Sequence, residues 1–189
     1  YNKNNMKLFS LLIKIPFFKR ILPSLLRNFF ILIKKEHFKI IFKNLVLETN
    51  IRDPHDREIF FTNQYEEKQF EEVFDIIKKN KIKIFIDIGA NAGIYSLILA
   101  KNSNLTIVAF EPIKSNHSKF LRKIKNNKLN NKINTYNFGL SNKKSKLKMK
   151  TNIKFGYKQS AGYAVSDDGQ EIAEFVKADD VLNYTNKMI

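Results

Sequence analysis

The chain contains no cysteine, so neither a disulfide framework nor a thiolate metal site can form. Its three histidines, His37, His55 and His117, are scattered along the sequence, and we therefore expect no metal site. Hydrophobic residues make up 43% of the chain, which is enough for a core and argues against wholesale disorder. These features predict a globular protein and fit a reducing, cytoplasmic setting.

Long apolar runs are also missing, although residues 6–47 are rich in apolar side chains. Lysines and arginines interrupt this region, so no run approaches the ~20 apolar residues that a bilayer span needs. Pro16 and Pro23 predict that any helix here breaks into short pieces. We expect residues 1–47 to form a basic helical arm. It either lies on the inner face of an anionic membrane as an amphipathic segment or packs on the main domain.

Acidic side chains are scarce, and their distribution is uneven. The net charge is +16; residues 1–47 hold ten Lys or Arg against Glu36 alone, and residues 112–166 hold fourteen with no acid. Such a field attracts anionic glycans, lipid head groups or nucleic acid. The chain is rich in Lys, Ile, Asn and Phe together, a composition that AT-biased coding produces without selection for binding. Charge alone therefore does not identify a partner.

Hydrophobic periodicity predicts an alternation of strands and helices beyond a connection at residues 48–63, which we expect to carry a short strand. Buried strands are expected at 82–89 and 105–112, and a third strand at 133–141. Helices are expected at 64–80, 93–102 and 115–127, the last with Ser115 as N-cap. Residues 144–150 should form an edge strand, followed by a strand at 172–178 and a short helix from 178. The order β-α-β-α-β indicates an α/β fold, a Rossmann-like doubly wound sheet.

The turn after the first predicted strand, in FIDIGANAGIYS, is unusually small. Gly89 permits a tight turn, Ala90 keeps its side chain short, and Gly93 lets the next helix begin close to the strand. A ligand can then lie over backbone N–H groups at the helix N-terminus. The dinucleotide fingerprint G-x-G-x-x-G fails here at Asn91 and Ile94, so a pyrophosphate is disfavoured.

Two acids suggest which ligand the turn takes. Asp87, two residues before Gly89, repels phosphate and suits a cationic group. Glu111 ends the second strand 22 positions after Gly89, the spacing at which an acid accepts hydrogen bonds from ribose hydroxyls. A cationic nucleoside without phosphate describes S-adenosylmethionine. At the end of the third strand, we expect Phe138 or Leu140 to cover the adenine.

These segments together, IDIGANAGIYS, VAFEPIKSN and NFGLSNKKSKLKM, resemble the FkbM-type family of class I S-adenosylmethionine-dependent methyltransferases over roughly residues 50–182. The resemblance implies that the loop residues line the methionine part of the cofactor and that Glu111 binds the ribose. The cofactor-binding residues expected in all are Asp87, Gly89, Ala90, Asn91, Gly93, Glu111, Pro112, Phe138, Gly139 and Leu140. Family members commonly methylate hydroxyl groups of sugars or secondary metabolites.

The family pattern continues with a fourth strand that this chain does not reach, so residues 48–189 are expected to be a partial domain, a fragment with only the first half of the sheet. The expected activity is O-methylation of a sugar, glycolipid or secondary-metabolite hydroxyl. We assign no catalytic base, since His55 and His117 are both expected at the surface. The alternative is a non-catalytic protein that binds the cofactor or the membrane periphery. A nucleic-acid methyltransferase lacks supporting motifs.

Overall fold

The structure is a computed structural model that describes the backbone of residues 16–154 and 157–185. The chain divides into two compact units. The first comprises residues 1–42 and 46–72, and the second comprises residues 43–45 and 73–189. The division therefore does not fall at residue 47, where the sequence suggested the end of an arm. It falls inside helix α4 (Glu67–Lys79), an element that the sequence predicted correctly.

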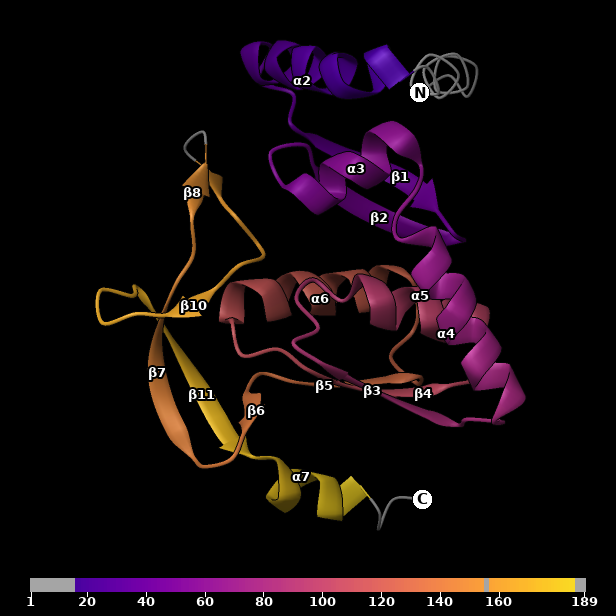
Figure 1. Cartoon of the computed structure of the whole chain (residues 1–189), viewed down its shortest axis with the longest axis vertical. Helices are drawn as coiled ribbons and strands as arrows, with labels where there is room; N and C mark the ends of the chain where they lie inside the picture. The colour runs from indigo at the N-terminus through magenta and orange to yellow at the C-terminus, as the bar shows by residue number, and fades with distance from the viewer. Residues whose placement is uncertain (1–15, 155–156, 186–189) are drawn as a thin grey trace. The chain divides into compact units, whose positions relative to one another are not determined.

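The first unit begins with helix α2 (Pro16–Leu32), drawn in indigo in Figure 1. Pro16 occupies its first position, where the missing N–H has no intrahelical partner to lose. Pro23 lies inside the helix, so the expectation that this proline would break the segment was wrong. Phe30 packs on Phe38 and Phe60, with ring centroids 5.1 and 6.2 Å away. These aromatic contacts hold one side of α2 against its own unit.

A β-hairpin follows, formed by β1 (His37–Phe42) and β2 (Leu45–Asn50). Its two-residue turn places Lys43 and Asn44 at φ values of 44° and 64°, the left-handed conformation that matches the twist of hairpin strands. The expected helical arm is therefore corrected over residues 37–47, which form strands with alternating burial over 37–42. Residues 1–15 of that arm lie outside the described residues. Helix α3 (Pro54–Thr62) completes the unit, with the Asp53 side chain accepting N–H bonds at its start.

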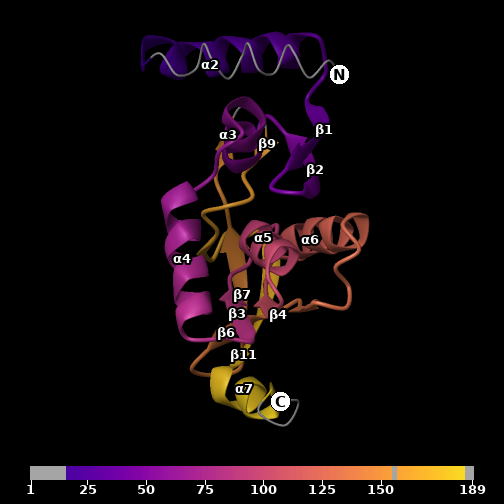
Figure 2. The ribbon, with the colours of Figure 1, turned by 90° about the vertical axis from the view of Figure 1, so that its right-hand side faces the viewer.

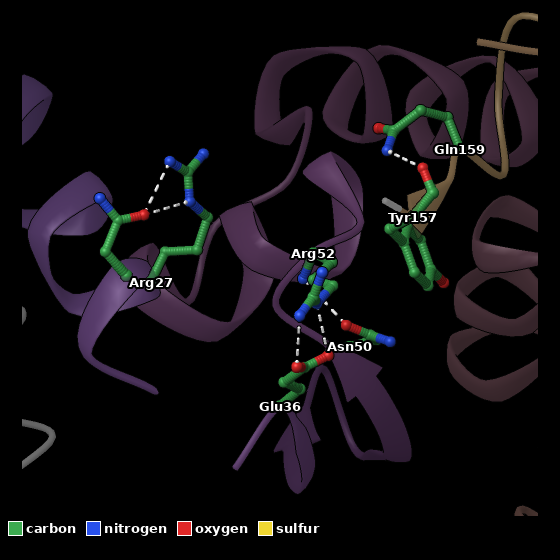
Figure 3. A network of polar contacts seen from close by, with 7 residues as sticks. Arg27, Glu36, Asn50, Arg52, Tyr157 and Gln159 are labelled. Carbon is green, nitrogen blue, oxygen red and sulfur yellow. Dashed lines mark hydrogen bonds and ion pairs between the residues drawn. The ribbon is translucent and has the colours of Figure 1, made fainter. Parts of the chain in front are cut away.

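An ion pair ties the start of the hairpin to the end of β2. The Arg52 guanidinium donates to both carboxylate oxygens of Glu36, at 2.6 and 2.7 Å (Figure 3). The Asn50 side-chain oxygen accepts from the Arg52 N–H, and the Asp56 carboxylate accepts from the Asn50 N–H. Arg52 lowers the pKa of Glu36, mainly through this hydrogen bond. Glu36, Arg52 and Asp56 therefore have a structural role in this unit, because each of them holds one segment of it to another.

The second unit contains the parallel sheet expected from the sequence. Strands β3 (Ile84–Ile88), β4 (Thr106–Phe110) and β5 (Ile133–Tyr136) lie in that order, and both pairs are parallel. Helices α5 (Ile94–Asn102) and α6 (Lys114–Asn126) connect them and lie on the same side of the strands (Figures 1 and 2). The β-α-β-α-β prediction is confirmed. Ile113, rather than Ser115, is the N-cap of α6.

The central strand β4 is buried on both faces, as the sequence predicted, but β3 is not. Register pairs Ile86 with Val108 and Ile88 with Phe110, so these four side chains share the face away from α5. On that face Val108 and Phe110 are buried, whereas Ile88 is 62% exposed. The prediction of a doubly buried β3 is therefore wrong, because β3 is the edge strand and one of its faces lacks cover.

The rest of the chain forms a second, mixed sheet in the order β10-β7-β11-β6. Its strands are β6 (Gly139–Ser141), β7 (Ser145–Lys150), β10 (Ala164–Val165) and β11 (Glu171–Lys177). The predicted single strand 133–141 is thus divided between two sheets. Strand β7 lies between β10 and β11, so its expected edge position is corrected. A small hairpin, β8 (Ile153–Lys154) and β9 (Tyr157–Lys158), and helix α7 (Ala178–Thr185) complete the unit.

Candidate functional site

The small-residue turn lies at the carboxyl end of β3, beside the end of β4. The N–H groups of Gly89 and Ala90 both donate to the Phe110 carbonyl, at 2.9 and 3.0 Å, and the Gly93 N–H donates to Ala90. Gly89, Asn91 and Gly93 adopt positive φ values of 79°, 53° and 76°. The sequence turns small here partly because this compact turn requires the left-handed conformation three times.

The two glycines differ in what surrounds them. A Cβ added at Gly93 would lie 1.9 Å from the Phe120 ring on α6, so only glycine fits between the start of α5 and that ring. A Cβ added at Gly89 would meet no atom within 4 Å. Gly93 is therefore required by packing as well as by φ, whereas Gly89 leaves open space beside the backbone. Open space beside a strand-end turn is compatible with close approach of a ligand.

Asp87 lies on the α5 side of β3, and its carboxylate oxygen Oδ2 accepts a hydrogen bond of 2.6 Å from the Ser96 hydroxyl. Burial raises the pKa of Asp87, and the bonds from Ser96 oppose that rise. Ser96 is fully buried in α5. The sequence reasoning missed Ser96; its signal was a serine among the apolar residues of a buried helix, where a hydroxyl needs a polar partner.

Glu111 is 4% exposed and binds two backbone segments. Oε2 accepts the Asn91 N–H at 2.7 Å, and Oε1 accepts the Ile113 N–H at 2.8 Å. The Asn116 side chain, which the sequence analysis also missed, bonds the same carboxylate. Because a carboxylate offers about four acceptor positions, roughly one remains. The expected capture of both ribose hydroxyls by free oxygens does not match this geometry.

The structure brings the two acids together. Burial raises the pKa of Glu111, its hydrogen bonds lower it, and the nearby charge of Asp87 raises it further. Strand register places Asp87 beside Ala109, two residues before Glu111. Both carboxylates therefore belong to one strand-end cluster with the turn between them. Such paired, buried acids with perturbed pKa values mark candidate functional sites, although structural networks also produce them.

Asn91 and Pro112 complete the turn side of the cluster. The Asn91 side-chain oxygen Oδ1 is buried and, among the residues that the structure describes, has no hydrogen-bond partner. Pro112 follows Glu111, and the Asn137 side chain donates to the carbonyls of both residues, at 2.9 and 3.3 Å. An unpaired buried acceptor needs an explanation, and an approaching donor would provide one.

The third predicted strand end has a packing role. Phe138 forms a tilted aromatic cluster with Phe110 and Tyr136, each 5.6 Å away between ring centroids. A Cβ at Gly139 would lie 2.5 Å from the Phe175 ring, and Leu140 pairs with Val176 across β6 and β11. These contacts explain why glycine stands at 139 without invoking a ligand.

One hollow of about 520 Å³ lies away from the cluster, along α6 and β5. Its lining residues are Leu121, Ile124, Lys125, Asn130, Ile133, Asn134, Thr135 and Tyr136. None of the ten residues expected to bind the cofactor lines it. Two histidines make contacts of their own: His117 bonds the backbone of Thr135, burial lowers its pKa, and His55 contacts the Tyr65 hydroxyl at 3.3 Å. The His117 Nε2 atom is buried and has no hydrogen-bond partner among the residues that the structure describes.

Comparison with known proteins adds little. No protein-family model and no curated protein matches the chain. A crystal structure of a Pyrococcus horikoshii protein, provisionally described as a transferase, matches at 14% identity with a TM-score of 0.39. The match covers 54% of this chain and 36% of the other, so this chain spans about a third of that protein. A likeness this weak carries no argument about activity.

The length and apolar content of each helix show whether it could cross a membrane. Within residues 16–154 and 157–185, no helix combines the length and apolar content required to cross a bilayer. The same residues contain no group of three or more His, Asp or Glu placed to hold a metal ion.

Proposed function

We propose that the strand-end cluster binds S-adenosylmethionine and that the chain contributes the cofactor site of a methyltransferase. The observation that carries this proposal is the convergence of Asp87 and Glu111 on one glycine turn at neighbouring parallel strand ends. In open α/β sheets, ligands bind outside the carboxyl ends of the strands. Two carboxylates at that position favour a cation and disfavour a phosphate.

Each residue has a role in the proposal. Asp87, oriented by Ser96, attracts the cationic methionine part, and the open side of Gly89 admits the ligand backbone. Glu111 accepts one ribose hydroxyl at its remaining acceptor position. The unpaired Asn91 oxygen accepts a donor such as the ligand ammonium. Ala90, Gly93 and Pro112 shape the turn; Phe138, Gly139 and Leu140 act through packing, with Phe138 nearest the proposed adenine position.

The reaction itself would be displacement of the sulfonium methyl group by an acceptor oxygen. In such a transfer the protein mainly positions donor and acceptor and excludes water. The acceptor we propose is a hydroxyl of a sugar, glycolipid or secondary metabolite, a choice that depends on the FkbM-type resemblance alone. We assign no base toward that hydroxyl, so the proposal concerns cofactor binding first.

A second function class competes with it. Because Glu111 is almost fully buried and already binds Asn91, Ile113 and Asn116, the cluster can also serve only to join the turn to α6. In that case the acids stabilise the fold and bind nothing. Of the two non-catalytic alternatives, this outcome excludes cofactor binding and leaves the membrane-peripheral protein.

Isothermal titration calorimetry of the full chain with S-adenosylmethionine, S-adenosylhomocysteine and NAD separates the two. We expect both adenosyl ligands to bind and NAD not to bind. Asp87→Asn should weaken binding about tenfold, more for the sulfonium than for the thioether, because only the former carries the extra charge. Glu174→Gln, an exposed acid in β11, is the matched control and should have no effect. Absence of any adenosyl binding by the folded wild-type chain rejects the proposal.

A further inference from the structure

Helix α2 has two apolar sides over residues 23–32, and among the described side chains only one of these sides is packed. Phe30 faces inward and contacts Phe38 and Phe60 within the first unit. Leu25, Phe29 and Leu32 lie on the other side, at i, i+4 and i+7, and are 60%, 54% and 79% exposed. Because Phe30 fixes the rotation of the helix in its own unit, these three side chains form a stripe that points away from the packed side.

This exposed stripe is not explained by the fold. A single exposed leucine is ordinary, but three large apolar side chains in register over two turns form a contiguous patch. Ile33 extends it just beyond the helix end and is also exposed. Exposed apolar patches of this kind mark interaction sites.

The charges around the stripe select the partner. In the sequence, residues 16–35 contain no acid and five cations: Lys19, Arg20, Arg27, Lys34 and Lys35. Lys34 and Lys35 are exposed directly after the apolar residues. A second copy of a chain with net charge +16 would repel this region, whereas an anionic surface would attract it. An apolar stripe flanked by basic residues is the pattern of helices that lie on anionic bilayers.

The length of the helix fits a position along the surface rather than across the membrane. Its 17 residues span roughly 25 Å at 1.5 Å per residue, less than the ~30 Å hydrocarbon core. Arg27 also lies inside the helix, where a span would place it in the hydrocarbon.

We infer that the exposed side of α2 docks the protein on an anionic lipid surface, with Leu25, Phe29 and Leu32 inserted below the head groups and the lysines above them. The inference is independent of methyl transfer and stands whether or not the strand-end cluster binds a nucleoside. It would bring any site of the chain close to lipid-linked substrates.

The absence of tryptophan makes a direct test possible. Phe29→Trp gives a single reporter in the full chain, and Ile172→Trp, at a 69% exposed position on β11, gives a matched control. With vesicles of phosphatidylcholine containing about a third phosphatidylserine, we expect a blue shift for the first reporter only. Pure phosphatidylcholine should produce a much smaller shift. No shift at position 29 with anionic vesicles overturns the inference.

Flotation of the full chain with the same vesicles provides a second measurement. Phe29→Glu with Leu32→Glu should lower the bound fraction at least tenfold, as estimated from loss of two buried apolar side chains. Ile172→Glu should leave binding unchanged. Circular dichroism checks that each variant folds. Light scattering tests for a dimer: if the double variant abolishes self-association and leaves flotation unchanged, the stripe covers a second copy and the lipid surface is rejected.

Discussion

At the scale of single residues, the strand-end turn is determined by backbone conformation and by two contacts. Gly89 and Gly93 share nearly the same positive φ, yet only Gly93 is pressed against an aromatic ring. The sequence analysis treated both glycines as serving a ligand. The structure shows that packing against Phe120 requires glycine at position 93. At Gly89 the space beside the backbone is unoccupied.

This difference predicts unequal effects of alanine. Gly89→Ala should lower the free energy of unfolding by about 1 kcal/mol, because of the left-handed φ alone. Gly93→Ala should lower it by about 3 kcal/mol or more, since the new methyl group also overlaps Phe120. Urea denaturation measures both. Equal losses would show that the Phe120 contact does not constrain this position.

The pKa shifts of the two acids predict opposite pH dependences for stability and for binding. Burial raises the pKa of Asp87 and of Glu111, so the folded chain takes up protons at higher pH than the unfolded chain does. Stability therefore increases as the pH falls through the raised values and decreases above them. Affinity for a sulfonium ligand should fall in the same window, because the protonated acids no longer attract the cation.

Calorimetric titrations with S-adenosylmethionine in buffers from neutral to mildly acidic pH measure this effect. Asp87→Asn should flatten the pH profile, since one titrating group is gone. A wild-type affinity that is constant throughout the window would argue that these carboxylates do not face the ligand.

At the scale of elements, local periodicity identified the helices and strands of the parallel sheet well. The 3.6-residue pattern predicted α4, and the apolar runs predicted β3 and β4. The errors occurred where a tertiary contact overrode a prediction based on local sequence. Pro23 remains inside α2, a helix whose packed face is stabilised by aromatic contacts that the rule for isolated helices omits.

The hairpin turn offers a prediction at this scale. Lys43 adopts φ of 44°, a conformation that asparagine tolerates better than lysine. Lys43→Asn should therefore raise the free energy of unfolding by about 0.5–1 kcal/mol, and it leaves the backbone carbonyl that Asn102 bonds in place. Lys39→Asn, at an exposed position within β1, should be neutral or destabilising, because asparagine is disfavoured in strands. Thermal denaturation of the wild-type chain and of the two variants tests this prediction.

At the scale of the whole molecule, the dominant feature is uncompensated positive charge. The acid-free segment 112–166 contains fourteen cations, five of them in α6 and three in β7. Ion pairs of β7 with later residues, such as Lys146 with Glu174, are exposed and screened by water. Self-repulsion of a +16 chain therefore opposes compactness.

Salt should accordingly stabilise the chain. Raising ionic strength from about 0.01 to 0.1 M shortens the screening length from roughly 30 to 10 Å, so the melting temperature should increase. Lys143→Glu with Lys144→Glu changes two exposed cations to anions, which lowers the net charge from +16 by 4 to +12. The double variant should show a smaller increase. An equal increase would mean that salt acts by a route other than screening.

The sequence by itself determined the alternation of elements and the positions of Asp87, the glycine turn and Glu111, because hydrophobic periodicity, turn chemistry and strand ends are local properties. The structure alone decided that 133–141 divides between two sheets, that β3 is left exposed on one face, and that Ser96 and Asn116 hold the acids. It also decided which side of α2 packs. These outcomes depend on contacts between residues distant in the chain, and a helix or strand with two apolar faces carries no local information about which face will be covered.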